Sequence, residues 1–225
     1  NELSENFKET KSDYTFLKCN QFAIKDNLKN ICLKLIEKGY DYKKVQIMAP
    51  VYAGINGIDN LNKELQNVFN PKDDNKNEIK YGDVIYREND KVLQLVNIPD
   101  ENISNGDIGI IKNILKIDKK IFIYIDFDGN LVKYESKDLN KIKHGYVISI
   151  HKSQGSEFDV VVMLLCNSYK RMLYRKLIYT GITRAKKKLI LIGDMESFVY
   201  AVNNNDEYFR KTNLKNRLTY NILKK

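Results

Sequence analysis

Two short apolar runs constrain the fold of this 225-residue chain most, residues 159–166 (DVVVMLLC) and residues 188–193 (KLILIG). A strand that is almost entirely apolar is buried on both faces, and such strands occur in parallel sheets that helices cover. The longest stretch without a charge, residues 45–58, has 14 residues and falls short of the roughly 18 to 20 apolar residues of a membrane-spanning helix. The runs therefore predict an α/β fold built on a parallel sheet.

The segments around these runs alternate between strand and helix patterns. Residues 14–18 and 45–49 are predicted strands, and two segments between and after them carry apolar residues at helical spacing. The predicted helices cover residues 21–38, 57–69, 171–185, 195–204 and 206–221. Alternation of this kind is typical of a parallel sheet flanked by helices.

The middle of the chain has a different pattern. A polar connector over residues 72–80 leads into short segments rich in β-branched and aromatic residues, which predict strands over 83–86, 92–96, 109–117, 121–127 and 131–134. Turn signals such as Asp128-Gly129-Asn130 separate them. We expect a small closed β-barrel over 81–142, inserted between α/β segments over 1–80 and 143–225.

The net charge of +9 is concentrated in one window. Residues 141–188 hold 11 Lys and Arg against two acids, Glu157 and Asp159. This concentration of positive charge indicates a polyanionic binding partner. The alternative interpretation is a basic surface that contacts only solvent. The three cysteines are far apart and lie in apolar segments, so we expect reduced thiols in a cytoplasmic protein.

A polar loop, residues 149–157 (SIHKSQGSE), directly precedes the buried run. Loops at the ends of parallel strands lie at the edge of the sheet, where ligands bind in open α/β folds. His151, Ser153 and Gln154 offer hydrogen bonds, Lys152 offers a charge, and Gly155 permits close approach of a backbone. These groups suit a phosphate chain, although a loop without a ligand would have the same composition.

Arg184 ends the predicted helix just before the second apolar run. A rigidly held guanidinium can donate two parallel hydrogen bonds to a phosphoryl group that gains charge during transfer. The alternative is a surface ion pair, with Lys186–Lys188 as solvated charge.

Together these segments resemble motifs V and VI of superfamily 1 helicases, in the RecD-like (RecD/TraA) branch. The motif V resemblance rests on residues 149–162 (SIHKSQGSEFDVVV), and the motif VI resemblance on residues 177–193 (LIYTGITRAKKKLILIG). Residues 49–66 resemble the motif IV region, and YGDVIYREND and NGDIGII resemble parts of the inserted barrel of that family. The resemblance implies a second RecA-like domain with an inserted Src-homology-3-like barrel.

The resemblance also implies roles for individual residues. ATP would lie between two RecA-like domains, with Gly155, Glu157 and Arg184 contacting it from this chain and Arg184 acting in catalysis. Single-stranded DNA would lie along a further set of residues: Ser149, His151, Lys152, Ser153, Gln154 and Thr180. Translocation would run 5′ to 3′ by analogy with the branch.

Two features depart from the family pattern. No G-x-x-x-x-G-K-[ST] sequence occurs in the 225 residues, so the phosphate-binding loop is absent. Ala53 stands where many relatives carry a basic residue. We therefore expect the C-terminal portion of a longer chain, inactive alone, whose N-terminal RecA-like domain holds Mg²⁺ and the phosphate-binding loop.

Other candidate residues fit structural roles better. His144 is expected in a loop, and Asp126 and Asp128 are explained by a hairpin turn rather than by a metal site. Among the tyrosines of the basic window, Tyr169, Tyr174 or Tyr179 is a candidate for stacking on a base.

Two alternative functions remain open from the sequence. One is a non-catalytic nucleic-acid-binding module, and the other is the helicase segment of a conjugative relaxase. Repair and recombination proteins are candidate partners. The motifs are common to helicases of repair, of recombination and of plasmid transfer.

Overall fold

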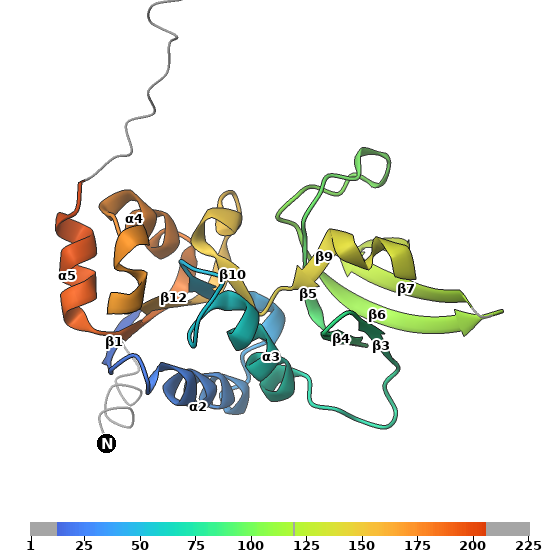
Figure 1. The fold of residues 1–225 in the computed structure, drawn as a ribbon, viewed down its shortest axis with the longest axis horizontal. Coiled ribbons are helices and arrows are strands. Elements are labelled where there is room, and N and C mark those ends of the chain that lie inside the picture. The colour runs from blue at the N-terminus through green and yellow to red at the C-terminus, as the bar shows by residue number, and fades with distance from the viewer. Residues whose placement is uncertain (1–12, 119, 206–225) are drawn as a thin grey trace, which may run out of the picture.

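The computed structural model describes residues 13–118 and 120–205, and its α/β part is built on a five-stranded parallel sheet (Figure 1). The strand order is β1-β12-β11-β2-β10, and all four pairings are parallel. The strands are β1 (Tyr14–Lys18), β2 (Val45–Ala49), β10 (Val147–Ser149), β11 (Phe158–Leu165) and β12 (Ala185–Gly193). The predicted parallel sheet is confirmed.

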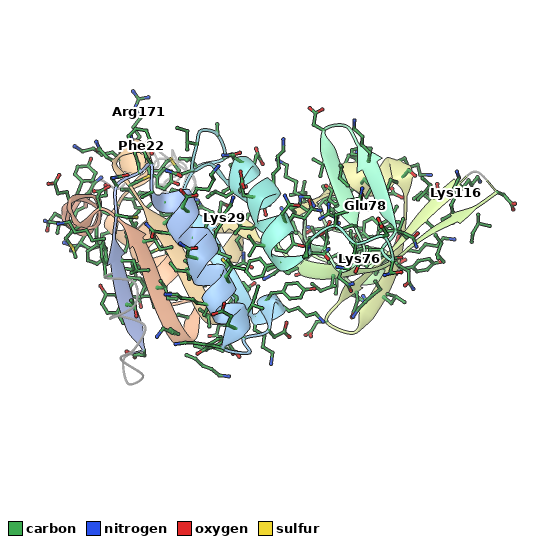
Figure 2. The ribbon with its side chains drawn as sticks, turned by 90° about the horizontal axis from the view of Figure 1, so that it is seen from below. Phe22, Lys29, Lys76, Glu78, Lys116 and Arg171 are labelled. Atoms are coloured by element: carbon green, nitrogen blue, oxygen red, sulfur yellow. The ribbon has the colours of Figure 1, made fainter. Side chains whose placement is uncertain are left out.

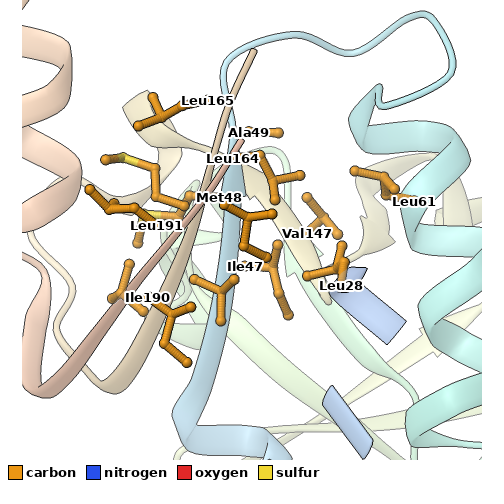
Figure 3. Close-up of a cluster of buried hydrophobic side chains, with 14 of the residues drawn as sticks. Leu28, Ile47, Met48, Ala49, Leu61, Val147, Leu164, Leu165, Ile190 and Leu191 are labelled. Carbon is orange, nitrogen blue, oxygen red and sulfur yellow. The ribbon is translucent and has the colours of Figure 1, made fainter. Parts of the chain in front are cut away.

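Helices cover both faces of this sheet. The helices α2 (Ile24–Glu37) and α3 (Ile58–Phe69) lie on one side, and α4 (Arg175–Ile182) and α5 (Met195–Asn203) on the other. Strands β2 and β11 are buried almost throughout because they are covered from both sides. Figure 3 shows Leu28 of α2 and Leu61 of α3 in the same buried cluster as Ile47 and Met48 of β2.

The segment between α3 and β10 forms the expected all-β insert. A hairpin of β3 (Glu78–Tyr81) and β4 (Val84–Arg87) accompanies an antiparallel sheet in the order β8-β7-β6-β5-β9. These strands are β5 (Lys91–Gln94), β6 (Ile108–Ile117), β7 (Lys120–Phe127), β8 (Asn130–Glu135) and β9 (Ile142–His144). Within residues 13–118 and 120–205 no ladder joins β8 to β9, so hydrogen bonds do not close the sheet into the expected barrel.

Several predicted boundaries differ from the structure. The predicted helix over 171–185 is a 3-10 helix (Asn167–Met172) followed by the shorter α4. The predicted connector contains β3, and the prediction for His144 is wrong, because this residue is buried and ends β9. The predicted helix over 206–221 lies outside the described residues.

Buried charged groups join the insert to the α/β part. Asp90, fully buried just before β5, accepts hydrogen bonds from Gln66 Nε2 and Asn70 Nδ2 at 2.7 Å and from the Tyr146 hydroxyl at 2.8 Å. Its Oδ2 also lies 3.2 Å from Nε2 of His144. A buried carboxylate with this many partners fixes the elements that supply them.

Lys91, the next residue, makes a second link across the junction. Its Nζ donates to the main-chain oxygens of Val45 at 2.9 Å and Lys43 at 3.2 Å. Complete burial disfavours the charged ammonium and lowers the pKa of Lys91 to about 7.

The free edge of the parallel sheet is covered by a side chain. The amide of Asn62 on α3 accepts from the Val147 N–H at 2.9 Å and donates to the Val147 carbonyl at 2.8 Å. One side chain thus satisfies both main-chain polar groups of Val147 in β10.

In the part of the chain that the structure describes, no helix has the length and apolar character needed to cross a membrane.

Candidate nucleotide and nucleic-acid site

The loop over residues 149–157 begins at the carboxyl end of β10 with a short 3-10 helix (Ile150–Ser153). Two serines stabilise this turn: Ser149 Oγ accepts from the Lys152 N–H at 3.3 Å, and Ser153 Oγ donates to the Ile150 carbonyl at 2.7 Å. Ser153 is fully buried. The hydroxyl groups of both serines are therefore used within the turn, which they hold in shape.

Three other side chains of the loop face outward. His151 is exposed, with Nε2 lying 3.2 Å from the hydroxyl of Tyr174, and Gln154 is exposed. Nζ of Lys152 donates to Oδ1 of Asn105, a residue of the insert. These side chains present a cation and hydrogen-bonding groups on one accessible turn.

The end of the loop is open around Gly155. This glycine has a φ of +87°, and no heavy atom lies within 4 Å of the position that a Cβ would take. A ligand can approach its backbone closely, and the left-handed conformation favours glycine. Glu157 is exposed and pairs with Lys186 at 3.1 Å.

Arg184 lies beside this loop, as its predicted role requires. Its side chain is half-buried, with Nε donating to the Thr180 carbonyl at 3.1 Å, Nη1 to the Ser156 carbonyl at 3.2 Å and Nη2 to Thr183 Oγ1 at 3.2 Å. The main chain is also joined here, since the Phe158 N–H donates to the Arg184 carbonyl at 2.9 Å.

These three bonds leave two of the five N–H groups of the guanidinium for a ligand. The guanidinium is half-exposed and is held in place by hydrogen bonds to the protein. It therefore fits an anionic phosphoryl group better than a mobile side chain would. The residues present at this point therefore fit a nucleotide phosphate.

Helix α4 places Arg184 through a close approach to the sheet. A Cβ at Gly181 would lie 2.6 Å from Met163 Sδ and 3.5 Å from Ile150 Cγ2. The glycine thus lets α4 pack directly on β11 and on the 3-10 turn of the loop. Thr180 Oγ1, in the same helix, donates to the Lys176 carbonyl at 2.9 Å.

An open hollow of about 580 Å³ adjoins the loop on the side of the insert. Glu157, Phe158 and Lys186 line it from the α/β part, and Ile108, Lys112 and Asp128 are among the residues that line it from the insert. One candidate nucleotide contact, Glu157, therefore shares a surface depression with the insert.

The three tyrosines that were candidates for base stacking differ in exposure. Tyr169 is 2% exposed, and its hydroxyl donates to the Asn56 carbonyl at 2.7 Å, so its ring is not available. Tyr174 is half-buried against His151, whereas Tyr179 is 69% exposed on α4. Only Tyr179 among them presents a free ring face.

The structure also shows which charged side chains of the basic window, residues 141–188, are paired. Its two acids pair with lysines of the same window, Glu157 with Lys186 and Asp159 with Lys187, the latter at 2.9 Å. Arg171 projects into solvent (Figure 2). In the described part of the chain, no group of three or more His, Cys, Asp or Glu side chains could hold a metal ion.

Sequence reasoning missed Asn105, which contacts Lys152 from the insert. The only signal at this position was the turn sequence Asn105-Gly106-Asp107, and a turn signal does not reveal which surface the turn faces.

The fold and the site define this chain as a RecA-like α/β domain with an inserted β domain. Residues 144–192 match the UvrD-like helicase C-terminal domain. Residues 61–127 match the SH3 domain of ATP-dependent RecD-like DNA helicases. The chain belongs to the RecD-like DNA helicases of superfamily 1.

Two curated relatives carry the same resemblance. The ATP-dependent RecD2 DNA helicase of Deinococcus radiodurans is 32% identical over 157 residues, which cover 70% of this chain and 21% of the relative. The RecBCD enzyme subunit RecD of Buchnera aphidicola is 29% identical over 209 residues, covering 84% of this chain and 32% of the relative. The chain thus spans between a fifth and a third of the length of these relatives.

Among solved structures, Bacteroides Pif1 bound to single-stranded DNA aligns with 88% of this chain and 54% of that chain, at 15% identity and a TM-score of 0.45.

Proposed function

We propose that this chain is the C-terminal motor part of an ATP-dependent DNA helicase. It binds single-stranded DNA and completes an ATP site whose phosphate-binding loop lies on an N-terminal RecA-like domain of the same protein. The observation that carries the proposal is the placement of Arg184, whose half-exposed guanidinium is held against the carbonyl of Ser156 at the end of the glycine-containing loop.

Arg184 stabilises charge on the transferred phosphoryl group. That group gains negative charge as it leaves, and a guanidinium with two unbonded N–H groups stabilises this charge without rearranging. Gly155 admits the nucleotide close to the backbone, and Glu157 contacts it after release from Lys186. Bound ATP with Mg²⁺ supplies the phosphoryl group, and the Mg²⁺ ligands belong to the N-terminal domain.

The turn over residues 149–154 is the proposed DNA surface. Lys152 and His151 contact the sugar–phosphate backbone, Gln154 and Thr180 extend the contact, and Ser149 and Ser153 shape the turn. Because this loop also leads to Gly155 and Glu157, closing of the ATP cleft moves the DNA contacts. By analogy with the resembling branch, we propose that translocation runs 5′ to 3′.

The domain division and the cellular setting are part of the same proposal. We propose motor segments over 1–80 and 143–225 around an insert over 81–142. Separate buried clusters in the α/β part and in the insert support this two-part division, with β3 and its Ile79 belonging to the insert. We place the protein in the cytoplasm, acting with repair or recombination proteins.

ATP turnover tests the proposal most directly. The full-length protein is expected to hydrolyse ATP with stimulation by single-stranded DNA, while residues 1–225 alone bind DNA and hydrolyse no ATP. DNA binding that weakens steeply with salt, combined with no turnover by the full-length protein, would instead support a non-catalytic binding module.

A further inference from the structure

One turn of the insert contacts the proposed DNA-binding loop. Residues 104–107 lie between the 3-10 helix (Pro99–Glu101) and β6. Two hydrogen bonds of 2.7 Å hold this turn: the Asn105 N–H donates to Asn97 Oδ1, and the Ser104 N–H donates to Asp107 Oδ2. The Gly106 N–H also donates to the Gln94 carbonyl at 2.9 Å. A turn with this many bonds is a rigid support.

The side chain of Lys152 contacts this turn, and its main chain lies close to it. Nζ donates to Oδ1 of Asn105. The carbonyl oxygen of Lys152 lies 3.5 Å from the position that a Cβ would take at Gly106, whose φ is +105°. The turn therefore holds the charged end of a long side chain whose main-chain end is already held by the bond from the Lys152 N–H to Ser149 Oγ.

Fixing Lys152 in this way favours anion binding. A lysine ammonium has three N–H groups, so the bond to Asn105 leaves two for a phosphate oxygen. Immobilising a long side chain on binding carries an entropic cost, and a side chain that is already held avoids much of it.

We propose that Asn105 is a positioning residue for DNA binding, which acts through Lys152 and links the insert to the DNA contact of the motor. This inference rests on the proposed function, because it takes Lys152 as a phosphate contact. It gives the insert a role in setting the affinity of the motor for DNA.

Binding of a fluorescent oligo-dT to residues 1–225, over a range of salt concentrations, tests the inference. Asn105→Ala is expected to weaken binding roughly 2- to 10-fold, the cost of immobilising one long side chain. The dependence on salt stays unchanged in this variant, because no cation is removed. Lys152→Ala weakens binding and also lowers the slope of log affinity against log salt by about 0.7.

The double variant separates a positioning role from general damage. If Asn105 acts through Lys152, Asn105→Ala has no further effect in the Lys152→Ala background, because the two losses are not additive. The matched control is Asn113→Ala, an exposed asparagine of β6, which leaves affinity unchanged. If Asn105→Ala lowers the melting temperature, Asn105→Ser replaces it, since serine keeps a polar turn residue that is too short for Lys152.

Two results overturn the inference in different ways. Additive losses, or full affinity in Asn105→Ala alongside weak binding by Lys152→Ala, reject the positioning role and leave the proposed function intact. Unchanged affinity and salt slope in Lys152→Ala reject the proposed DNA contact itself, and the positioning role with it.

Discussion

Nη1 of Arg184 lies 3.2 Å from the carbonyl oxygen of Ser156, and this bond joins the last residue before β12 to the loop before β11. The two motifs that the sequence separates by nearly thirty residues thus form one surface. The bond thus connects the loop that carries the proposed DNA turn to the proposed phosphate contact.

Replacement of Arg184 tests its role in hydrolysis. In the full-length protein, Arg184→Ala is expected to lower ATP turnover by roughly 10³-fold or more while ATP affinity changes little, because the charge that it stabilises develops in the transition state. Arg184→Lys keeps the charge, but it loses the planar fork and recovers only part of the rate. Steady-state turnover and equilibrium nucleotide binding measure the two effects.

The matched control for this experiment is Arg171→Ala, which removes an exposed arginine of the same basic window. It should retain wild-type turnover. Wild-type turnover in Arg184→Ala would instead remove the catalytic role from this residue.

The lysines of the basic window should differ in their effect on DNA affinity. Lys187→Ala is expected to weaken DNA binding less than Lys152→Ala, because the ammonium of Lys187 is already paired with Asp159 at 2.9 Å. Titrations of oligo-dT at low and moderate salt measure the difference. Equal losses in both variants would mean that the window acts as a diffuse charge and not through the turn at Lys152.

Asp90 should be important for stability. Asp90→Ala removes an acceptor from the buried donors of Gln66, Asn70 and Tyr146 and from the Arg87 N–H, and each N–H or O–H that is left unsatisfied costs roughly 1–3 kcal/mol. We expect the free energy of unfolding to fall by at least about 3 kcal/mol in urea denaturation. Asp100→Ala, which removes an exposed carboxylate of the insert, is the control and should change stability little. A stable Asp90→Ala variant would show that the junction does not depend on this carboxylate.

Lys91 should make stability depend on pH. Burial lowers its pKa in the folded protein to about 7, below the ordinary value of 10.5. Between these values the unfolded chain binds more protons than the folded chain, so this residue makes the free energy of unfolding rise with pH above about 7. Lys91→Met removes this contribution, and the difference between variant and wild type should change steadily from pH 7 to pH 9 in urea denaturation. A constant difference over that range would show that Lys91 stays charged in the fold.

The long apolar segments were predictable, and the short strands were not. Strands β1 and β2 have the predicted bounds: β2 is a short, mostly apolar segment that is buried throughout, and β1 alternates between more buried and more exposed residues. Strands β9 and β10 have three residues each and were missed, since so short a segment shows no period. Missing β9 also led to the wrong prediction for His144. This residue is buried because β9 pairs with β5, which brings its side chain beside Asp90.

The site was predictable in its residues but not in its contacts. The motif resemblance selected Arg184 and the loop over residues 149–157, which the structure places side by side. The sequence could not show that the hydroxyl of Ser153 is buried or that Asn105 reaches Lys152, because both facts depend on packing between segments far apart in the chain.

The amide of Asn62 has a consequence for the behaviour of the chain in solution. An exposed sheet border is a template on which a strand of another molecule can add, and uncontrolled addition leads to aggregation. At Val147 the donor and the acceptor that an incoming strand would need are already occupied. A single asparagine thus protects this border from growth by intermolecular pairing.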